Sequence, residues 1–155
     1  MGEHMLKQTH RILVVDDEAT SLVMLEKVLR NSYTVITARS GTEAIEVLKR
    51  EEISLIITDQ RMPGMTGTEL LREGQSLRPG MVSMLLTSNN DTETFIDAIT
   101  KAGALRVINK PWDSANLLTA VERSLKAYEK FVERKGSSDR LKLIREKLDK
   151  IAKPA

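Results

Sequence analysis

The sequence predicts a doubly wound α/β fold with a five-stranded parallel sheet and a helical extension at the C-terminus. Five short apolar runs recur along the chain, and a segment with apolar residues at helical spacing follows each of them. The runs are apolar at consecutive positions, which is typical of strands that a parallel sheet buries on both faces. Regular alternation of such strands and helices favours helices on both sides of one sheet.

The first two strand–helix units occupy residues 11–51. Residues 11–16 form an apolar run that ends in acidic residues, and residues 33–38 are rich in β-branched side chains, so both ranges are predicted strands. Residues 19–31 and 41–51 carry apolar residues three and four positions apart. This spacing predicts two amphipathic helices that pack against the sheet.

The third unit begins with another apolar run. Residues 53–58 are predicted to form a buried strand, and the Pro- and Gly-containing segment 60–67 a loop. The loop leads to a weak helix at 68–77, which Gly74 interrupts. Residues 81–87 form the next predicted strand.

The last elements of the predicted sheet follow residue 90. A helix is predicted at 91–102 and ends at a glycine, and a short strand at 105–109 is stopped by Pro111. Asp113 is the expected N-cap of a final helix that reaches about residue 135.

Two apolar series with heptad spacing lie in the C-terminal region, and the residues Gly136, Ser137 and Ser138 separate them. The inner series is Leu118, Val121, Leu125, Tyr128 and Val132, and the outer series is Leu141, Ile144, Leu148 and Ile151. Such spacing is typical of a coiled coil, so a homodimer through this helix or a connection to an output domain is possible. The simpler alternative is that the first half packs on the sheet and only the rest projects. We therefore expect a disordered N-terminus or tag remnant at 1–10, a folded domain at 11–130 and a helical linker or coiled-coil extension at 131–155.

Composition excludes several classes of protein. The 155 residues include no cysteine, and the only histidines, His4 and His10, fall in the predicted disordered N-terminus. Disulfides, zinc–thiolate sites and a Ser-His-Asp triad are thereby excluded, and a reducing cytoplasm is the expected location. No apolar run approaches the ~20 residues that a membrane helix needs, so no membrane contact is expected.

Charge is uneven along the chain. The net charge is +2, but residues 122–155 hold 11 Lys and Arg against 6 Asp and Glu, a net of +5. A basic tail could contact nucleic acid or an acidic partner, although a solvated helix face is the simpler explanation. Since no nucleic-acid-binding motif accompanies the tail, no direct nucleic-acid binding is expected of this chain.

Polar residues suited to one pocket follow four of the five predicted strands. They are Asp16, Asp17 and Glu18 after the first strand, Asp59 after the third, Thr87 and Ser88 at the fourth and Lys110 after the fifth. The second strand ends in Ala38-Arg39-Ser40 and offers no clear ligand. Each residue alone has a simple structural explanation as a cap, a turn residue or a surface lysine. Because the carboxyl ends of parallel strands meet at one sheet edge, their joint occurrence predicts a shared site.

The chemistry available to this pocket is narrow. Carboxylates held close together repel one another, and a divalent cation removes that repulsion. Oxygen ligands without His or Cys favour Mg²⁺ and leave coordination positions open for phosphate oxygens. A lysine and a threonine hydroxyl could bind the remaining phosphate oxygens. Asp59, fixed at the end of a buried strand, is the expected nucleophile, which would form an acyl phosphate.

Four motifs together resemble the receiver domain of bacterial two-component response regulators, of the chemotaxis-regulator type. They are Ile12-Leu-Val-Val-Asp-Asp-Glu18, Asp59-Gln-Arg-Met-Pro-Gly64, Leu86-Thr-Ser88 and Lys110-Pro111. The resemblance covers residues 11–130 and implies a flavodoxin-like sheet with strand order 2-1-3-4-5.

The resemblance also implies roles for the pocket residues. Asp59 would accept a phosphoryl group from the phosphohistidine of a sensor kinase or phosphotransfer protein, in a reaction that needs Mg²⁺. The metal ligands would be Asp17, Asp59 and the backbone carbonyl of Arg61, with Asp16 acting through water. Thr87 would be the switch hydroxyl and Lys110 the phosphate-binding lysine, followed by a cis peptide bond to Pro111. The domain would be regulatory rather than an enzyme and would catalyse only its own phosphorylation and dephosphorylation.

One position departs from the family pattern. Many receivers carry Tyr or Phe three residues before the lysine, where this chain has Val107. A ring that swings inward with the threonine is therefore not available here.

Two alternatives remain open from the residues alone. A phosphatase of the haloacid-dehalogenase type would use Asp16 as nucleophile, since Asp16-Asp-Glu-Ala-Thr20 partly matches that family's signature, with Glu18 as the second acid. A receiver-like module that binds partners without reacting is the other alternative.

Overall fold

A computed structural model describes residues 10–88, 97–99, 103 and 106–152, and within them one parallel sheet contains all the strands. Its order is β2-β1-β3-β4-β5, which confirms the order that the resemblance implied. The strands are β1 (Arg11–Val15), β2 (Thr34–Ala38), β3 (Leu55–Asp59), β4 (Val82–Thr87) and β5 (Arg106–Asn109).

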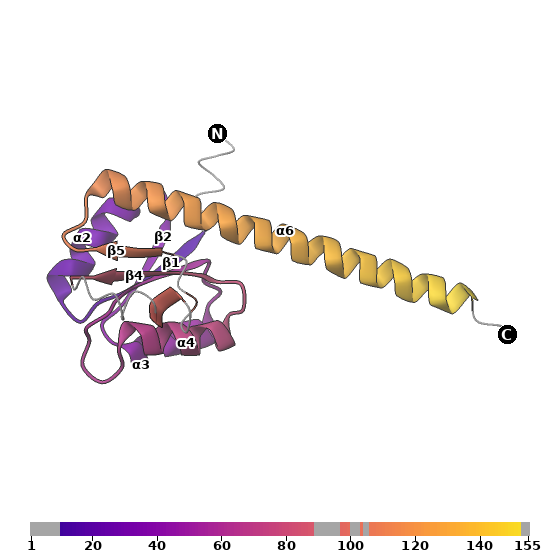
Figure 1. The fold of residues 1–155 in the computed structure, drawn as a ribbon, viewed down its shortest axis with the longest axis horizontal. Helices are drawn as coiled ribbons and strands as arrows, with labels where there is room; N and C mark the ends of the chain where they lie inside the picture. Colours follow the sequence, from indigo (N-terminus) through magenta and orange to yellow (C-terminus); the bar gives the residue numbers. More distant parts are fainter. Residues whose placement is uncertain (1–9, 89–96, 100–102, 104–105, 153–155) are drawn as a thin grey trace.

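Helices cover both faces of the sheet, as predicted (Figure 1). They are α2 (Ala19–Leu29), α3 (Gly41–Arg50), α4 (Gly67–Leu77) and α6 (Ser114–Ala152). Alternate residues of β1 face opposite sides: Leu13 and Val15 belong to the core under α3 and α4, whereas Ile12 and Val14 belong to the core under α2 and α6. Because the strand period is two, a run that is apolar throughout serves both cores at once.

Local capping explains where the helices begin. The Ser40 hydroxyl accepts a hydrogen bond from the Glu43 amide at 3.1 Å, and Thr66 caps α4 in the same way through the amide of Glu69 at 3.3 Å. The predicted cap of α6 is also present, since Asp113 Oδ2 accepts from the Asn116 amide at 3.4 Å. The helix predicted at 91–102 lies mostly outside the described residues, although 97–99 are helical, and so does the first residue of the strand predicted at 105–109.

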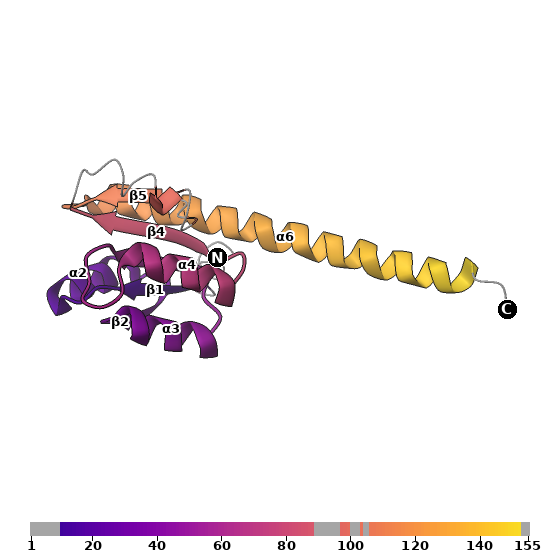
Figure 2. The ribbon, with the colours of Figure 1, turned by 60° about the horizontal axis from the view of Figure 1, so that its bottom comes forward.

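The predicted helix break at Gly136-Ser137-Ser138 is wrong. Helix α6 continues without interruption from Ser114 to Ala152, and its second half projects from the domain (Figures 1 and 2). A single glycine costs a helix only about 1 kcal/mol relative to alanine, and the good helix formers Glu133, Arg134 and Lys135 precede this one. The cost therefore does not end the helix.

Most of the inner apolar series packs on the domain, which was the simpler of the two sequence-based explanations, and Val132 at its end is exposed. Val121 and Leu125 are buried, and Leu118 packs against the same core cluster. Because these residues pack against the core of the domain, they cannot also form a coiled coil between two copies of the chain. The outer series stays exposed.

His10 was predicted to lie in a disordered terminus, and the structure contradicts this. It is buried, with Nε2 donating to Glu129 Oε1 at 2.8 Å and Nδ1 lying 3.1 Å from the Ser54 hydroxyl. Its ring also meets Tyr128 edge to face. These contacts join the start of β1 to α6, a long-range pairing that no local pattern reveals. Residues 1–9 lie outside the described part of the chain.

Candidate functional site

Three carboxylates meet at the carboxyl edge of the sheet. One oxygen from each of Asp16, Asp17 and Asp59 lies within 4.8 Å of the other two. The register explains the meeting, because Val15 of β1 pairs with Thr58 of β3, so both strands end at the same level. The shared acidic site expected from the sequence is therefore formed.

Asp16 is the most buried of the three, with 1% of its surface exposed. Its Oδ1 accepts a hydrogen bond from the Glu18 amide at 3.0 Å, and its Oδ2 lies 3.4 Å from Lys110 Nζ. Burial of an ionised carboxylate requires such partners. Asp16 therefore serves as a fixed negative charge behind the other two acids.

Lys110 reaches the same carboxylates from the opposite side. Its Nζ lies 2.9 Å from Asp59 Oδ1, and its backbone amide donates to the Thr87 carbonyl at 2.8 Å, which ties the end of β5 to β4. The peptide bond from Lys110 to Pro111 is cis, as the resemblance implied. The lysine is thus already in contact with the carboxyl group that would carry a phosphoryl group.

Burial and the contact between Asp59 and Lys110 have opposite effects on the pKa of each residue. Burial raises the pKa of Asp59 above its ordinary value, the hydrogen bond and charge of Lys110 oppose the rise, and the charge of Asp16 adds to it. Burial lowers the pKa of Lys110, but the hydrogen bond and charge of Asp59, together with Asp16, outweigh it and raise the pKa overall. Lys110 is therefore firmly cationic, whereas the Asp59 carboxylate is a stronger base than an exposed one.

The other predicted residues lie around this centre at different depths. Thr87 is buried at the end of β4, one residue beyond Leu86, which pairs with Asp59. Arg61 is exposed in the segment between β3 and α4. Glu18 and Ser88 are exposed, and Glu18 does not belong to the three-carboxylate group.

The close approach of α4 to Asp59 depends on a glycine. A Cβ atom built at Gly67 would collide with the Asp59 carbonyl oxygen, and the Gly67 amide donates to the Gln60 carbonyl at 3.0 Å. Only glycine therefore lets the helix begin this close to the end of β3.

Arg39 is a site neighbour that sequence reasoning missed. It follows β2, whose end was judged to offer no ligand, and its Nη2 donates to the Asp17 carbonyl at 3.3 Å. Just before it, the Ala38 carbonyl accepts from the Asp16 amide at 3.2 Å. Its position in the sequence could have indicated this role, since Arg39 directly follows a strand that ends at the same sheet edge. It braces the backbone that carries the paired acids.

The donor set fits a hard divalent cation. The three clustered groups offer only carboxylate oxygens, which Mg²⁺ prefers, and no His or Cys of the described chain joins them. A cation held there would relieve the repulsion among three acids that have only one lysine beside them.

A cleft of about 320 Å³ opens beside the carboxylates, next to the start of α2 and the segment after β5. It is lined by Asp16, Ser21, Met24, Leu25, Ser88, Lys110, Pro111 and Trp112. Its walls are largely apolar, and Asp16 and Lys110 are its charged lining residues. A partner side chain could therefore reach the acidic site through an apolar opening.

Comparison with known proteins identifies relatives of this chain. The family model described as the response regulator receiver domain matches residues 12–122. The hydrogenase transcriptional regulatory protein HoxA of Cupriavidus necator is 37% identical over 116 residues, which are 75% of this chain and 24% of that protein. The transcriptional regulatory protein ZraR of Escherichia coli is 36% identical over 115 residues, 74% of this chain and 26% of that protein. The chain thus spans about a quarter of the length of these curated relatives.

Solved structures agree with the sequence comparison. A structure described as adenylate cyclase from Rhodopirellula baltica superposes with a TM-score of 0.80 at 32% identity, covering 84% of this chain and 97% of that one. A CheY-like response regulator receiver domain protein from Methanospirillum hungatei gives 0.75 at 33% identity, covering 78% and 97%.

The phosphatase alternative finds no support in these findings. The matching family model is a different one, and the proposed nucleophile Asp16 is buried between the Glu18 amide and Lys110. Glu18, its proposed second acid, lies outside the carboxylate group.

Proposed function

The chain belongs to the receiver domains of two-component response regulators, and on this premise we propose that Asp59 is its phosphoacceptor. A carboxylate oxygen of Asp59 would attack the phosphorus of a phosphohistidine, the bond from phosphorus to the donor imidazole would break, and an acyl phosphate would form. The observation that carries this proposal is the 2.9 Å contact of Lys110 Nζ with an oxygen of Asp59, inside the three-carboxylate cluster.

The neighbouring residues supply position and charge. Asp17, Asp59 and the Arg61 carbonyl would hold Mg²⁺, with Asp16 acting through water, and the bound ion would neutralise charge on the carboxylates and phosphoryl oxygens. Lys110 would move from the Asp59 carboxylate to a phosphoryl oxygen, because the phosphoryl group carries more negative charge than the free carboxylate. The buried position of Thr87 at the end of β4 suits a hydroxyl that donates to another phosphoryl oxygen.

The output step would differ from receivers that rely on an aromatic ring. Val107 is half-buried and packs against the core under α3 and α4. A valine side chain has no ring to move between an exposed and a buried position. We therefore place the response to phosphorylation in the backbone next to Thr87 and in the region of Trp112.

A receiver domain interacts with a histidine kinase or a phosphotransfer protein, and we propose that the donor approaches over α2 and the cleft beside it. Val23 and Met24 of α2 are exposed apolar residues, and Met24 also lines the cleft with Trp112. An apolar surface next to the acceptor would exclude water from the transfer. The domain would act as a cytoplasmic regulator that catalyses only its own phosphorylation and dephosphorylation.

Mass analysis after treatment with acetyl phosphate and Mg²⁺ tests the acceptor. We expect the wild-type chain to gain one phosphoryl group, Asp59→Asn to gain none, and the control Asp16→Asn to keep the gain at a lower rate. Phosphoryl labelling that survives Asp59→Asn would reject Asp59 as the acceptor. Failure of the wild-type chain to bind Mg²⁺ or beryllofluoride would instead favour a receiver-like module that no longer reacts.

A further inference from the structure

The outer half of α6, residues 133–152, carries a row of apolar side chains that the described chain leaves uncovered. Figures 1 and 2 show this segment projecting beyond the sheet. The outer series Leu141, Ile144, Leu148 and Ile151 is exposed by 66%, 54%, 59% and 81%. Contiguous exposed apolar rows of this kind mark interaction surfaces.

The outer series does not continue the buried side of α6, since its residues lie about 80° to 160° around the helix from Leu125. Leu125 is buried on the side of α6 that packs on the sheet, and Leu141 follows it by 16 residues. At 3.6 residues per turn, this separation places Leu141 about 160° around the helix from Leu125. The domain that covers the inner series therefore cannot cover the outer one.

The projecting helix lacks the support that packing gives. Most helical stability in proteins comes from packing of an apolar face, and this segment also contains Gly136 followed by two serines. A second helix against the outer series would provide the missing packing.

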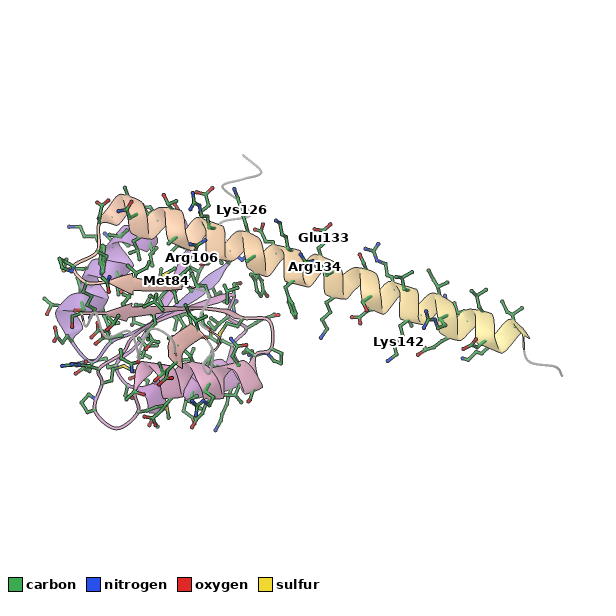
Figure 3. The ribbon with its side chains drawn as sticks, viewed as in Figure 1. Met84, Arg106, Lys126, Glu133, Arg134 and Lys142 are labelled. Carbon is green, nitrogen blue, oxygen red and sulfur yellow. The ribbon has the colours of Figure 1, made fainter. Side chains whose placement is uncertain are left out.

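The charges directly beside the outer series are all of one sign, and the one acid at a flanking position of residues 133–152 is Glu133, a full heptad before Arg140. With Leu141 and Leu148 at heptad position a, and Ile144 and Ile151 at position d, the flanking e and g positions of residues 140–152 hold Arg140, Arg145, Lys147 and Ala152. The acidic residues of the same stretch, Glu146 and Asp149, lie toward the opposite side. In Figure 3 the labelled Glu133 and Lys142 project from opposite sides of this segment, and Ile144, 11 residues after Glu133, lies on the side of Glu133.

This flanking pattern opposes the pairing of two identical copies. In a parallel pair, Arg140 of one copy would face Arg145 of the other, and in an antiparallel pair each flanking cation would face its own kind. Like charges at these positions disfavour association, whereas opposite charges select partners.

We propose that the outer series is a docking surface for an amphipathic α-helix of a different protein, one with apolar residues on its facing side and Asp or Glu at its flanking positions. The two helices would form a short coiled coil in which the partner's acids meet Arg140, Arg145 and Lys147. This proposal is independent of phosphorylation at Asp59, because the surface lies outside the domain that carries the site.

Two labelled peptides test the proposal against the full 155-residue chain. Both have three heptads with Ile and Leu at a and d, and they carry either Glu or Lys at every e and g position. Fluorescence anisotropy should give a Kd at least about tenfold lower for the Glu peptide, and Ile144→Asp with Leu148→Asp should abolish its binding. Added salt should reduce the ratio between the Kd values of the two peptides, because it screens the charges.

Charge reversal separates docking from general attraction between opposite charges. The double variant Arg145→Glu with Lys147→Glu should reverse the preference in favour of the Lys peptide. Lys142→Glu changes the charge on the far side of the helix and should leave the preference in favour of the Glu peptide.

Three outcomes would overturn the proposal. The first is equal affinity for the two peptides, and the second is a preference that Lys142→Glu alters as much as the flanking double variant does. The third is sedimentation equilibrium that shows the chain dimerising by itself in a way that Leu148→Asp abolishes, since the occupant would then be a second copy. Far-UV circular dichroism of each variant should match the wild type, because all the substituted residues are exposed.

Discussion

At the scale of single residues, burial and the neighbouring lysine have opposite effects on the carboxyl group of Asp59. Partial burial of Asp59 favours its protonated form, while Lys110 at 2.9 Å favours the ionised form. The ionised form is the one that would attack phosphorus in the proposed reaction. The lysine therefore prepares Asp59 for reaction before any phosphoryl group arrives.

We expect the Asp59 carboxyl of the metal-free protein to titrate above its ordinary pKa of 3.8. Because folding raises this pKa, the carboxyl contributes most to stability below its unfolded pKa, and that contribution is lost as the pH rises through the folded pKa. Lys110→Met should raise the pKa of Asp59 further, since it removes the group that opposes the rise. Carboxyl-carbon NMR titration measures both values, with Asp59→Asn identifying the signal, and a midpoint at or below 3.8 would contradict the expectation.

Repulsion among the three carboxylates should also appear as a loss of stability. Without divalent ions, Asp17→Asn should increase the free energy of unfolding by roughly 1 kcal/mol, which is a few degrees in Tm for a domain of this size. Asp139→Asn, which removes the same charge from the exposed part of α6, should have little effect. Urea unfolding with chelator present compares the variants, and an unchanged or lower value for Asp17→Asn would argue against strain in the cluster.

At the scale of elements, contacts just past the ends of several strands tie neighbouring elements together. Arg39 braces Asp17 from the end of β2, and the Lys110 amide bonds the end of β4. Gly80, with φ of 94°, forms the turn before β4, and a Cβ there would collide with the ring of Phe131 in α6. Gly136 is different, because nothing lies within 4 Å of a Cβ built at it.

The two glycines should therefore respond to alanine in opposite ways. Gly136→Ala should stabilise the outer half of α6 by about 1 kcal/mol, seen as slower amide exchange over residues 133–152. Gly80→Ala should lower the free energy of unfolding of the domain by more than about 1 kcal/mol, since it adds backbone strain and displaces Phe131. Equal effects of the two substitutions on global unfolding would be inconsistent with this difference.

At the scale of the whole molecule, α6 links opposite edges of the sheet. It begins beside the carboxylate site, just after Lys110 and Pro111, and crosses the sheet to the edge where β1 begins. There His10, which also contacts the Ser54 hydroxyl, bonds Glu129, and Phe131 packs on Gly80. A shift near Trp112 would therefore pass along one continuous helix to its projecting half.

Truncation should locate the end of the folded domain. A chain that ends after Glu133 keeps every packed residue of α6 and should lose less than about 0.5 kcal/mol. A chain that ends after Lys126 loses Tyr128, the Glu129 bond to His10, and Phe131, and should lose roughly 2–4 kcal/mol. Urea unfolding measures both, and similar losses would mean that the outer half stabilises the domain.

Much of the fold could be predicted from sequence because its signals are local. Strands buried on both faces are apolar at every position, and amphipathic helices repeat every three to four residues, so both patterns stand out in short windows. The acids, the threonine and the lysine of the site could be grouped because parallel strands bring their ends to one edge. The order of the strands came only through the likeness of the motifs to a known family.

The α/β class, the positions of the strands and the residues gathered at their carboxyl ends therefore follow from local patterns in the amino-acid sequence. Three features became visible only in the folded chain: Glu129 anchors His10, Arg39 braces Asp17 and α6 continues past Gly136. The first two are contacts between segments far apart along the chain, which leave no periodic signal. The third depends on whether the cost of a glycine within a helix, about 1 kcal/mol, is enough to end the helix, and the presence of Gly136 alone does not show this.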